Sequence, residues 1–339
     1  MWRSNSSAAA SAPSSAAPER VTTPSTSTPT PTSASTSTPT PAPTPTTTTM
    51  STPLVWLITG STSGFGSEIA KAALARGDHV IATARDPTKA SMTELTSLGA
   101  SALALDITND DTVISSAVAS AVAIHGRLDI VLNNAAYILE GAVEECSSDE
   151  VSAMFDTNVF GQLRMLRAVL PYMRAARSGV VANMGSIGGW GGMANGSLYC
   201  ASKCALLAIS EGLRLEVAHL GIDVTLIEPG YFRTDFLSGG HKVTPKRHIA
   251  DLDPATKPVR DALVSLNREQ PGDPAKGARL IVEALTKSGR CHGRSLPRRL
   301  LLGSDAIEFT GSQMETWQKE IAEWKELTLS TDHDDVAKK

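Results

Sequence analysis

The sequence predicts an α/β protein built on a parallel, doubly wound sheet with helices on both faces. From Pro53 onward, short apolar runs alternate with longer segments of helical spacing, which is typical of successive strand–helix units. The runs are continuously apolar, as expected of strands that helices cover on both faces. No internal repeat interrupts this order, so we expect a single domain over residues 51–330.

Six strands are predicted before residue 231, and a further apolar run follows near the C-terminus. The six are LVWLIT (54–59), HVIATA (79–84), SALALD (101–106), LDIVLNNA (128–135), SGVVANMGS (178–186) and IDVTLIEPG (222–230), and the later run is RRLLLG (298–303). The segments between them have helical length and spacing, for example 67–77, 111–126 and 150–176.

The stretch 231–272 breaks the alternation, because it is rich in Gly, Pro and charged residues. It follows the C-terminal end of a strand, the edge at which open α/β sheets bind ligands. We interpret it as a substrate lid, with a mobile surface loop as the alternative. Beyond it the sequence predicts a helix near 273–287, a last helix rich in Trp and Glu, and a flexible tail over 331–339.

The first 49 residues differ in composition from the rest of the chain. They are nearly all Ser, Thr, Pro and Ala, and they cannot bury enough apolar surface to offset the entropy of ordering. We expect a disordered tail over 1–50, with translation from Met50 as the alternative. The tail has neither the apolar core of a secretion signal nor the arginines of a mitochondrial presequence. A cytoplasmic location is expected, and organellar targeting stays open.

Charge and composition exclude several functional classes. The chain has a net charge of −4, and Arg3, Glu19 and Arg20 give the tail +1, so the body carries −4 − (+1) = −5. A mildly acidic body argues against binding to nucleic acid or anionic membranes. The chain contains no run of about 18 apolar residues, so no membrane span is predicted. The four cysteines show no CxxC spacing, so we expect free thiols and no metal site.

A glycine-rich turn follows the first strand and opens the first helix. Glycine lets a backbone turn tightly and approach a pyrophosphate, while the helix N-terminus offers free N–H groups and a positive dipole end. The strand–turn–helix context favours nucleotide binding, and a turn needed only for close packing is the alternative. The candidate cofactor residues of this turn are Gly60, Ser61, Ser63, Gly64, Phe65 and Gly66.

The end of the second strand indicates which dinucleotide binds. An acidic residue there would bond the ribose 2′-OH of NAD, whereas an arginine would pair with the 2′-phosphate of NADP. Ala84 stands at the acidic position and Arg85 follows it, so NADP(H) is preferred. Asp86 keeps NAD(H) open, since a shift of one residue would return an acid to the site.

Five motifs in order resemble the short-chain dehydrogenase/reductase family. They are TGSTSGFG (59–66), NNAA (133–136), Ser186, YCASK (199–203) and PGYFRT (229–234). The TGxxxGxG spacing is that of the standard subgroup, and the segment EPGYFRTDF resembles members that act on hydroxysteroids, retinoids and fungal metabolites. The resemblance implies a Rossmann-type sheet of about seven strands in the order 3-2-1-4-5-6-7, and a homodimer or homotetramer.

The same resemblance implies a catalytic set. Tyr199 would donate or accept the proton, and Lys203 would assist it. Ser186, thirteen residues before the tyrosine, would bond the substrate oxygen. Asn158 would hold a water that links Lys203 to solvent.

Further cofactor contacts are implied along the strand ends. Asp106 would contact the adenine, and Asn133 would lie beside the adenine ribose in a motif that also contains Ala135. The nicotinamide end would be held by Pro229, Gly230, Phe232 and Thr234, together with Tyr199 and Lys203. One departure is that Ala136 replaces a common glycine, which would be strained if the position required a positive φ.

These residues suit carbonyl–alcohol interconversion. A tyrosine with a pKa of about 10 is a poor base, and a lysine four residues later on a helix lies next to it and favours the phenolate. Trp190, Met193, Phe232 and Phe236 are candidates for an apolar substrate pocket, with ordinary packing as the alternative. We expect His241 and His248 to face solvent.

The leading hypothesis is an NADP(H)-dependent oxidoreductase that interconverts a ketone or aldehyde and an alcohol on a fairly apolar small molecule. Two alternatives stay open. One is a non-catalytic NADP(H)-binding regulator on the same fold. The other is an epimerase or dehydratase that regenerates its cofactor.

Overall fold

The computed structural model describes residues 52–238, 240–333 and 335–336. Pro53–Lys339 form one compact unit. The tail predicted over 1–50 lies outside the described residues. Of the tail predicted over 331–339, the described residues follow the last helix as exposed turns.

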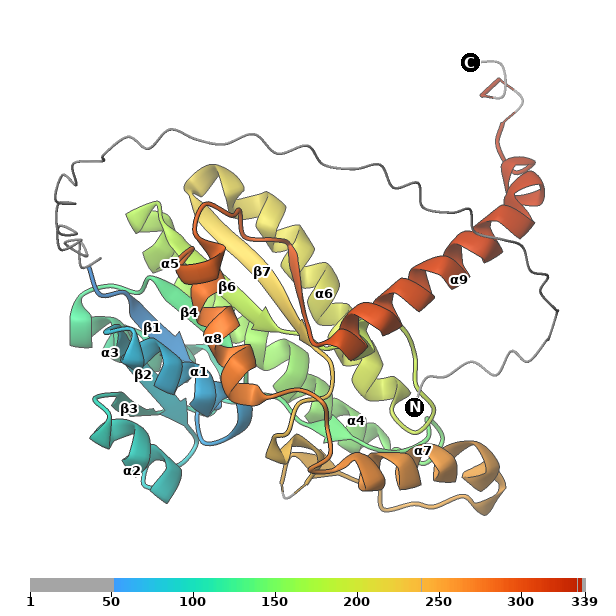
Figure 1. Ribbon diagram of the computed structural model, residues 1–339, viewed down its shortest axis with the longest axis horizontal. Helices are drawn as coiled ribbons and strands as arrows, with labels where there is room; N and C mark the ends of the chain where they lie inside the picture. The colour runs from blue at the N-terminus through green and yellow to red at the C-terminus, as the bar shows by residue number, and fades with distance from the viewer. Residues whose placement is uncertain (1–51, 239, 334, 337–339) are drawn as a thin grey trace, which may run out of the picture. The chain divides into compact units, whose positions relative to one another are not determined.

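A seven-stranded sheet forms the centre of this unit (Figure 1). Its order is β3-β2-β1-β4-β6-β7-β9, and all neighbouring pairs are parallel. The strands are β1 (Val55–Ile58), β2 (His79–Ala84), β3 (Ser101–Ala104), β4 (Ile130–Asn133), β6 (Gly179–Met184), β7 (Ile222–Pro229) and β9 (Arg299–Leu302). The predicted order is confirmed, because β5 (Ile138–Leu139) and β8 (Lys242–Val243) form a separate parallel pair.

Helices cover both faces of the sheet (Figure 1). On one face, α1, α2 and α8 pack with Trp56 and Ile58; on the other, α3, α5 and α6 pack with Val55 and Leu57. Successive side chains of a strand point to opposite faces, so a continuously apolar strand serves both cores. The helices are α1 (Gly64–Ala75), α2 (Ala90–Ser97), α3 (Asp111–His125), α4 (Ser148–Phe155), α5 (Gly161–Ala176), α6 (Ser197–Val217), α7 (Asp253–Leu266), α8 (Pro274–Leu285) and α9 (Ser304–Leu329).

The helix predicted over 150–176 is interrupted by a π-helical turn, η1 (Asp156–Phe160). A capping box of Ser147 and Glu150 begins α4, and α5 resumes at Gly161. The backbone of Gly161 lies so close to the Ile107 carbonyl that a side chain there would overlap it. π-turns of this kind occur frequently at functional sites.

The segment predicted as a lid is largely ordered into short elements. It contains η4 (Asp235–Leu237), β8, η5 (Ala250–Leu252) and α7. Strand β8 joins it to β5, which follows the NNAA motif. In the described part of the chain, none of the helices combines the length and apolarity that crossing a membrane requires.

Candidate functional site

The glycine-rich turn between β1 and α1 has the geometry of an anion cradle. Gly60 and Gly64 have positive φ values of 67° and 54°. A side chain on Gly66 would overlap the Gly60 carbonyl oxygen. Ser63, the N-cap of α1, makes no side-chain capping bond, so the first amides of this helix remain free to receive an anion. The residues present therefore fit the phosphates of a dinucleotide.

Asn134 fixes the shape of this turn, and the sequence analysis missed it. Its Nδ2 atom donates to the carbonyl oxygens of Thr59 and Gly60, at 3.0 and 3.1 Å. Thr59 Oγ1 in turn accepts from the backbone N–H groups of Asn134 and Ala135. The available signal was the second asparagine of the NNAA motif. Ala136 does not have a positive φ, so the strain considered for it does not arise.

Asn133 lies in the core and not at the surface of the site. Its side chain is fully buried, and its Nδ2 atom donates to Asn183 Oδ1 at 2.9 Å, which ties β4 to β6. Asn183 in turn donates to Ser210 on α6. The role implied for Asn133 beside the adenine ribose stays a prediction.

The end of β2 is followed by an exposed arginine, Arg85, and by an aspartate, Asp86, whose carboxylate is already hydrogen-bonded. Arg85 is the first residue after the strand and is exposed, and no hydrogen bond or ion pair engages its guanidinium in the described part of the chain. The Asp86 carboxylate accepts from the backbone N–H and the hydroxyl of Thr88, at 2.9 and 2.6 Å. These two bonds hold the Asp86 pKa below its usual value.

The segment 231–272, predicted as a lid, reaches the glycine-rich turn of residues 59–66 through His241. We call this turn the phosphate turn, after its predicted ligand. Its Nε2 atom lies 2.9 Å from Ser63 Oγ, and the ring is half-buried. Burial lowers the His241 pKa; Asp235 opposes this shift, and Arg85 and Lys89 add to it. The prediction that His241 faces solvent is therefore wrong, because the segment 231–272 folds back onto the turn at Ser63.

His248 differs from His241 and keeps an exposed side chain. It lies within ion-pair distance of Glu145 and Asp253. These contacts hold it on the outer side of the lid segment, as predicted.

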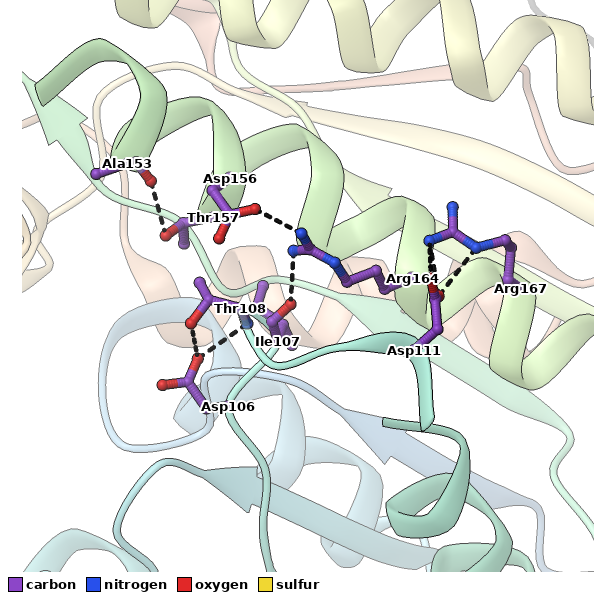
Figure 2. Close-up of polar contacts among 9 residues, drawn as sticks. All are labelled: Asp106, Ile107, Thr108, Asp111, Ala153, Asp156, Thr157, Arg164 and Arg167. Carbon is purple, nitrogen blue, oxygen red and sulfur yellow. Dashed lines mark hydrogen bonds and ion pairs between the residues drawn. The ribbon is translucent and has the colours of Figure 1, made fainter. Parts of the chain in front are cut away.

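The loop after β3 is tied to the π-turn, as Figure 2 shows. Arg164 pairs with Asp156 at 2.7 Å and reaches the Ile107 carbonyl oxygen at 3.4 Å. Asp106, the predicted adenine contact, is half-buried and accepts from the backbone N–H and the hydroxyl of Thr108. Its position at the C-terminal end of β3 places it on the ligand-binding edge of the sheet.

Ser186, Tyr199 and Lys203 come together after β6 and on α6. The Ser186 hydroxyl lies close enough to the Tyr199 phenol to lower its pKa and so to oppose part of the rise caused by burial. Lys203 Nζ donates to the Met184 carbonyl oxygen at 2.8 Å and lies 5.7 Å from the centre of the Tyr199 ring. Burial raises the pKa of Tyr199, and burial lowers the pKa of Lys203 to about 7.

Asn158 lies on the π-turn and joins it to α6. It is fully buried; Oδ1 accepts from Tyr137 N–H, and Nδ2 donates to the Tyr137 carbonyl oxygen and to Ser202 Oγ. Ser202 Oγ also donates to the Tyr199 carbonyl oxygen, at 2.7 Å. Asn158 therefore links Tyr137, which follows β4, to Ser202 on α6. Its implied role in holding water stays a prediction.

The end of β7 lies against the phosphate turn. After Pro229 and Gly230 the chain crosses to α1, where the Phe232 ring packs on Phe65 with centres 4.8 Å apart. The side chain of Thr234 faces Gly64, where a modest side chain would come into van der Waals contact with it. The structure thus brings the predicted nicotinamide-end residues next to the predicted phosphate-binding residues.

An apolar cluster surrounds Tyr199. The Phe236 ring lies 5.9 Å from the Tyr199 ring, and Met193 packs in the same cluster. Its other members are Tyr137, Ile138, Leu139, Cys146, Val151, Met154, Phe155, Leu198 and Cys200. The remaining two predicted pocket residues lie elsewhere, Phe232 against Phe65 and Trp190 against Ile187 and Phe309.

The four cysteines lie in the described part of the chain and are not paired with one another. All four cysteines are free thiols, with Cys200 buried and Cys204 exposed. Within the described ranges, no group of three or more His, Cys, Asp or Glu side chains could hold a metal ion.

Comparisons with known proteins agree with this geometry. The family described as short chain dehydrogenase matches residues 54–242. Oxidoreductase BOA17 of Botryotinia fuckeliana is 34% identical over 82% of this chain and 98% of its own length. The 3-ketodihydrosphingosine reductase of Bacteroides thetaiotaomicron is 36% identical over 72% of this chain and 81% of its own length. A short-chain dehydrogenase structure from Streptomyces avermitilis, 39% identical, covers 83% of this chain and 100% of its own with a TM-score of 0.75.

Solved structures similar to this chain contain either dinucleotide. A metagenomic short-chain oxidoreductase with NADP is 25% identical, with a TM-score of 0.56 over 74% of this chain and 96% of its own. A Burkholderia phymatum structure with NAD shares the fold at 20% identity, with a TM-score of 0.68 over 79% of this chain and 95% of its own. The motifs, the sheet order and these matches show that the chain is an NAD(P)-dependent oxidoreductase and belongs to the short-chain dehydrogenase/reductase family.

Proposed function

We propose that this enzyme interconverts a ketone or aldehyde and an alcohol on a fairly apolar small molecule, with NADP(H) as its cofactor and Tyr199 as its acid–base group. The observation that carries the proposal is the contact of Tyr199 with Ser186 on one side and Lys203 on the other, inside an apolar cluster. The end of β7 and the phosphate turn lie together at the same edge of the sheet.

The nicotinamide supplies or accepts the hydride, and the protein must manage the proton. Burial raises the pKa of Tyr199, so its phenol stays protonated at neutral pH and can donate to the oxygen of a reacting carbonyl. The Ser186 hydroxyl lies beside that phenol and can donate to the same oxygen as negative charge develops on it. Its position is fixed because Ser186 Oγ accepts from Gly188 N–H at 3.0 Å.

Lys203 stabilises the phenolate that remains after proton transfer. Its ammonium lies close to the Tyr199 ring, and an opposite charge at that range favours the ionised phenol. Because burial brings the Lys203 pKa to about 7, this group can exchange protons near neutral pH. Asn158 acts as a positioning residue, since it holds the first turn of α6 through Ser202.

The apolar cluster supports a substrate with a hydrophobic body. Met193 and Phe236 pack with Tyr199, so a carbonyl at the phenol would have apolar neighbours. A relative named as a 3-ketodihydrosphingosine reductase acts on a ketone of this character. We assign this chain the same broad class of substrate and no particular member of it.

The charges beside the phosphate turn support NADP(H). Arg85 is exposed at the end of β2 and has no hydrogen bond or ion pair among the described residues, whereas the Asp86 carboxylate is bound to Thr88. Arg85 and Lys89 each interact electrostatically with His241. The 2′-phosphate of NADP would therefore meet several basic groups. The ribose 2′-hydroxyl of NAD would find no free carboxylate at Asp86 to accept its hydrogen bond.

The segment 231–272 serves as the substrate lid. Lys242 of β8 pairs at 2.7 Å with the buried carboxylate of Glu140, which also accepts from Asn195. Together with the contact between His241 and Ser63, this pairing anchors the segment next to both halves of the site.

Replacing Tyr199 with Phe tests the assignment. NADPH oxidation would be followed with a panel of apolar ketones and aldehydes, with NADH in parallel. We expect Tyr199→Phe to lose turnover and to retain NADPH binding by fluorescence titration. Full activity in this variant would refute the acid–base role, and a preference for NADH would refute the cofactor assignment.

A further inference from the structure

Beyond its first turns, α9 is exposed in the described part of the chain, and the ring of its Trp317 stacks with Trp190. Its first turns lie against β9 and η2 (Ile187–Trp190), where Ala306, Phe309 and Thr310 are buried. From Met314 to Leu329 every residue is exposed. Figure 1 shows this part of the helix standing clear of the other elements.

Four large apolar side chains form one face of this exposed half. Met314, Trp317, Ile321 and Trp324 are separated by three, four and three residues, the spacing of a heptad seam. Their exposed fractions are 47, 47, 68 and 60%. We call this set the α9 stripe. An isolated helix of about 16 residues is marginal in water, so a helix that also exposes two tryptophans is expected to have a partner.

Charge and composition decide between the possible partners. Between Ser304 and Leu329 there are six acidic residues and two lysines, so this helix would be repelled by an anionic lipid surface. Residues 1–51 consist mainly of Ser, Thr, Pro and Ala and offer no apolar pattern to match the stripe. A second copy of the chain supplies an identical stripe.

The charges beside the stripe select an orientation. Glu320 precedes Ile321 and Lys325 follows Trp324, so the two lie at the positions that flank a heptad seam on opposite sides. In a parallel pair, Glu320 of each copy lies beside Lys325 of the other, which gives two attractive contacts. An antiparallel pair would instead place like flanks side by side.

We propose that α9, from Met314 onward, pairs in parallel with α9 of a second copy of this chain, stripe against stripe. The pair connects to the active-site region, because the Trp317 ring lies 6.5 Å from Trp190 on η2. The Arg299 guanidinium in turn stacks on the Trp190 ring, with its Cζ atom 3.6 Å from the ring centre. The proposal concerns the surface of α9 and does not depend on the proposed cofactor or substrate.

Cross-linking of the full-length enzyme tests the pairing directly. In a parallel pair the two copies of residue 321 face one another, so Ile321→Cys should give a covalent dimer under mild oxidation. Glu323→Cys on the outer face of the same helix is the matched control, and the wild type shows the background from native thiols such as Cys204. A dimer yield from Ile321→Cys no higher than that from Glu323→Cys would overturn the proposal.

Charge reversal in the Ile321→Cys background tests the orientation. Lys325→Glu or Glu320→Lys alone should lower the cross-linking yield several-fold, and the two together should restore it. Glu323→Lys, which changes the charge on the outer face, should leave the yield unchanged. Single reversals without effect would overturn the parallel pair. Binding of the wild-type enzyme to phosphatidylcholine vesicles, with no cross-linking of Ile321→Cys, would identify lipid as the partner instead.

Discussion

Lys203 gives a measurable link between the proposed catalytic site and the stability of the fold. Its ammonium is buried, which lowers its pKa from 10.5 to about 7 in the folded enzyme. In the unfolded chain the lysine stays protonated until about pH 10.4. Between these values the unfolded state binds one more proton, so this group makes the enzyme more stable as the pH rises. From pH 7 to pH 9 the gain integrates to about 2 kcal/mol.

The assay compares the free energy of unfolding of two proteins at several pH values. Urea unfolding of the wild type and of Lys203→Met would be measured at pH 7, 8 and 9. Other titrating groups contribute equally to both, and the unpaired Met184 carbonyl in the variant adds a constant offset. The stability of the wild type relative to the variant should therefore increase by about 2 kcal/mol over this range. Parallel pH profiles would refute the depressed pKa, whatever the effect of the substitution on turnover.

Three further predictions concern the cofactor end of the site. Arg85→Ala should raise the KM for NADPH about 10-fold or more and leave that for NADH nearly unchanged, as the loss of a charge-assisted bond requires; equal effects on both cofactors would contradict the assignment. His241 should take up a proton when a phosphate binds beside Ser63, so NADPH affinity should fall as pH rises through neutrality; in His241→Gln, fluorescence titrations should show a weaker pH dependence than the wild type. Gly66→Ala should lose NADPH binding because its Cβ meets the Gly60 carbonyl, whereas Gly212→Ala, with open space around it, should be neutral or stabilising by up to about 1 kcal/mol.

Much of the fold was predictable because its signals are local. The central strand β1 is a continuous apolar run that is buried on both faces, and β4 is likewise buried throughout, whereas the edge strand β3 leaves one face exposed, at Ala102 and Ala104. The glycines of the phosphate turn have a steric reason to be glycine, at Gly60 through its φ and at Gly66 through its contact. The spacing of Tyr199 and Lys203 on one helix likewise follows from sequence alone.

The features that sequence reasoning missed depend on contacts between distant segments. Asn134 bonds residues some 75 positions earlier, and His241 reaches a serine 178 positions away. The π-turn at Asn158 has no periodicity signal, because it adds one residue to a pattern that otherwise reads as one helix. The pairing of β5 with β8 involves two residues from each strand, which is too short to stand out in a sequence.

These long-range contacts also explain why the two ends of the site are joined. His241 of the segment 231–272 lies beside the glycine-rich turn, and the next residue, Lys242, pairs with Glu140, which follows the strand β5 that packs with Tyr199. Strand β8 therefore lies between a residue that contacts the turn and the strand β5, whose side chains pack with Tyr199. Since the segment 231–272 is joined to the site by the His241–Ser63 contact and the two-residue pairing of β5 with β8, we expect it to be able to open while the seven-stranded sheet stays intact.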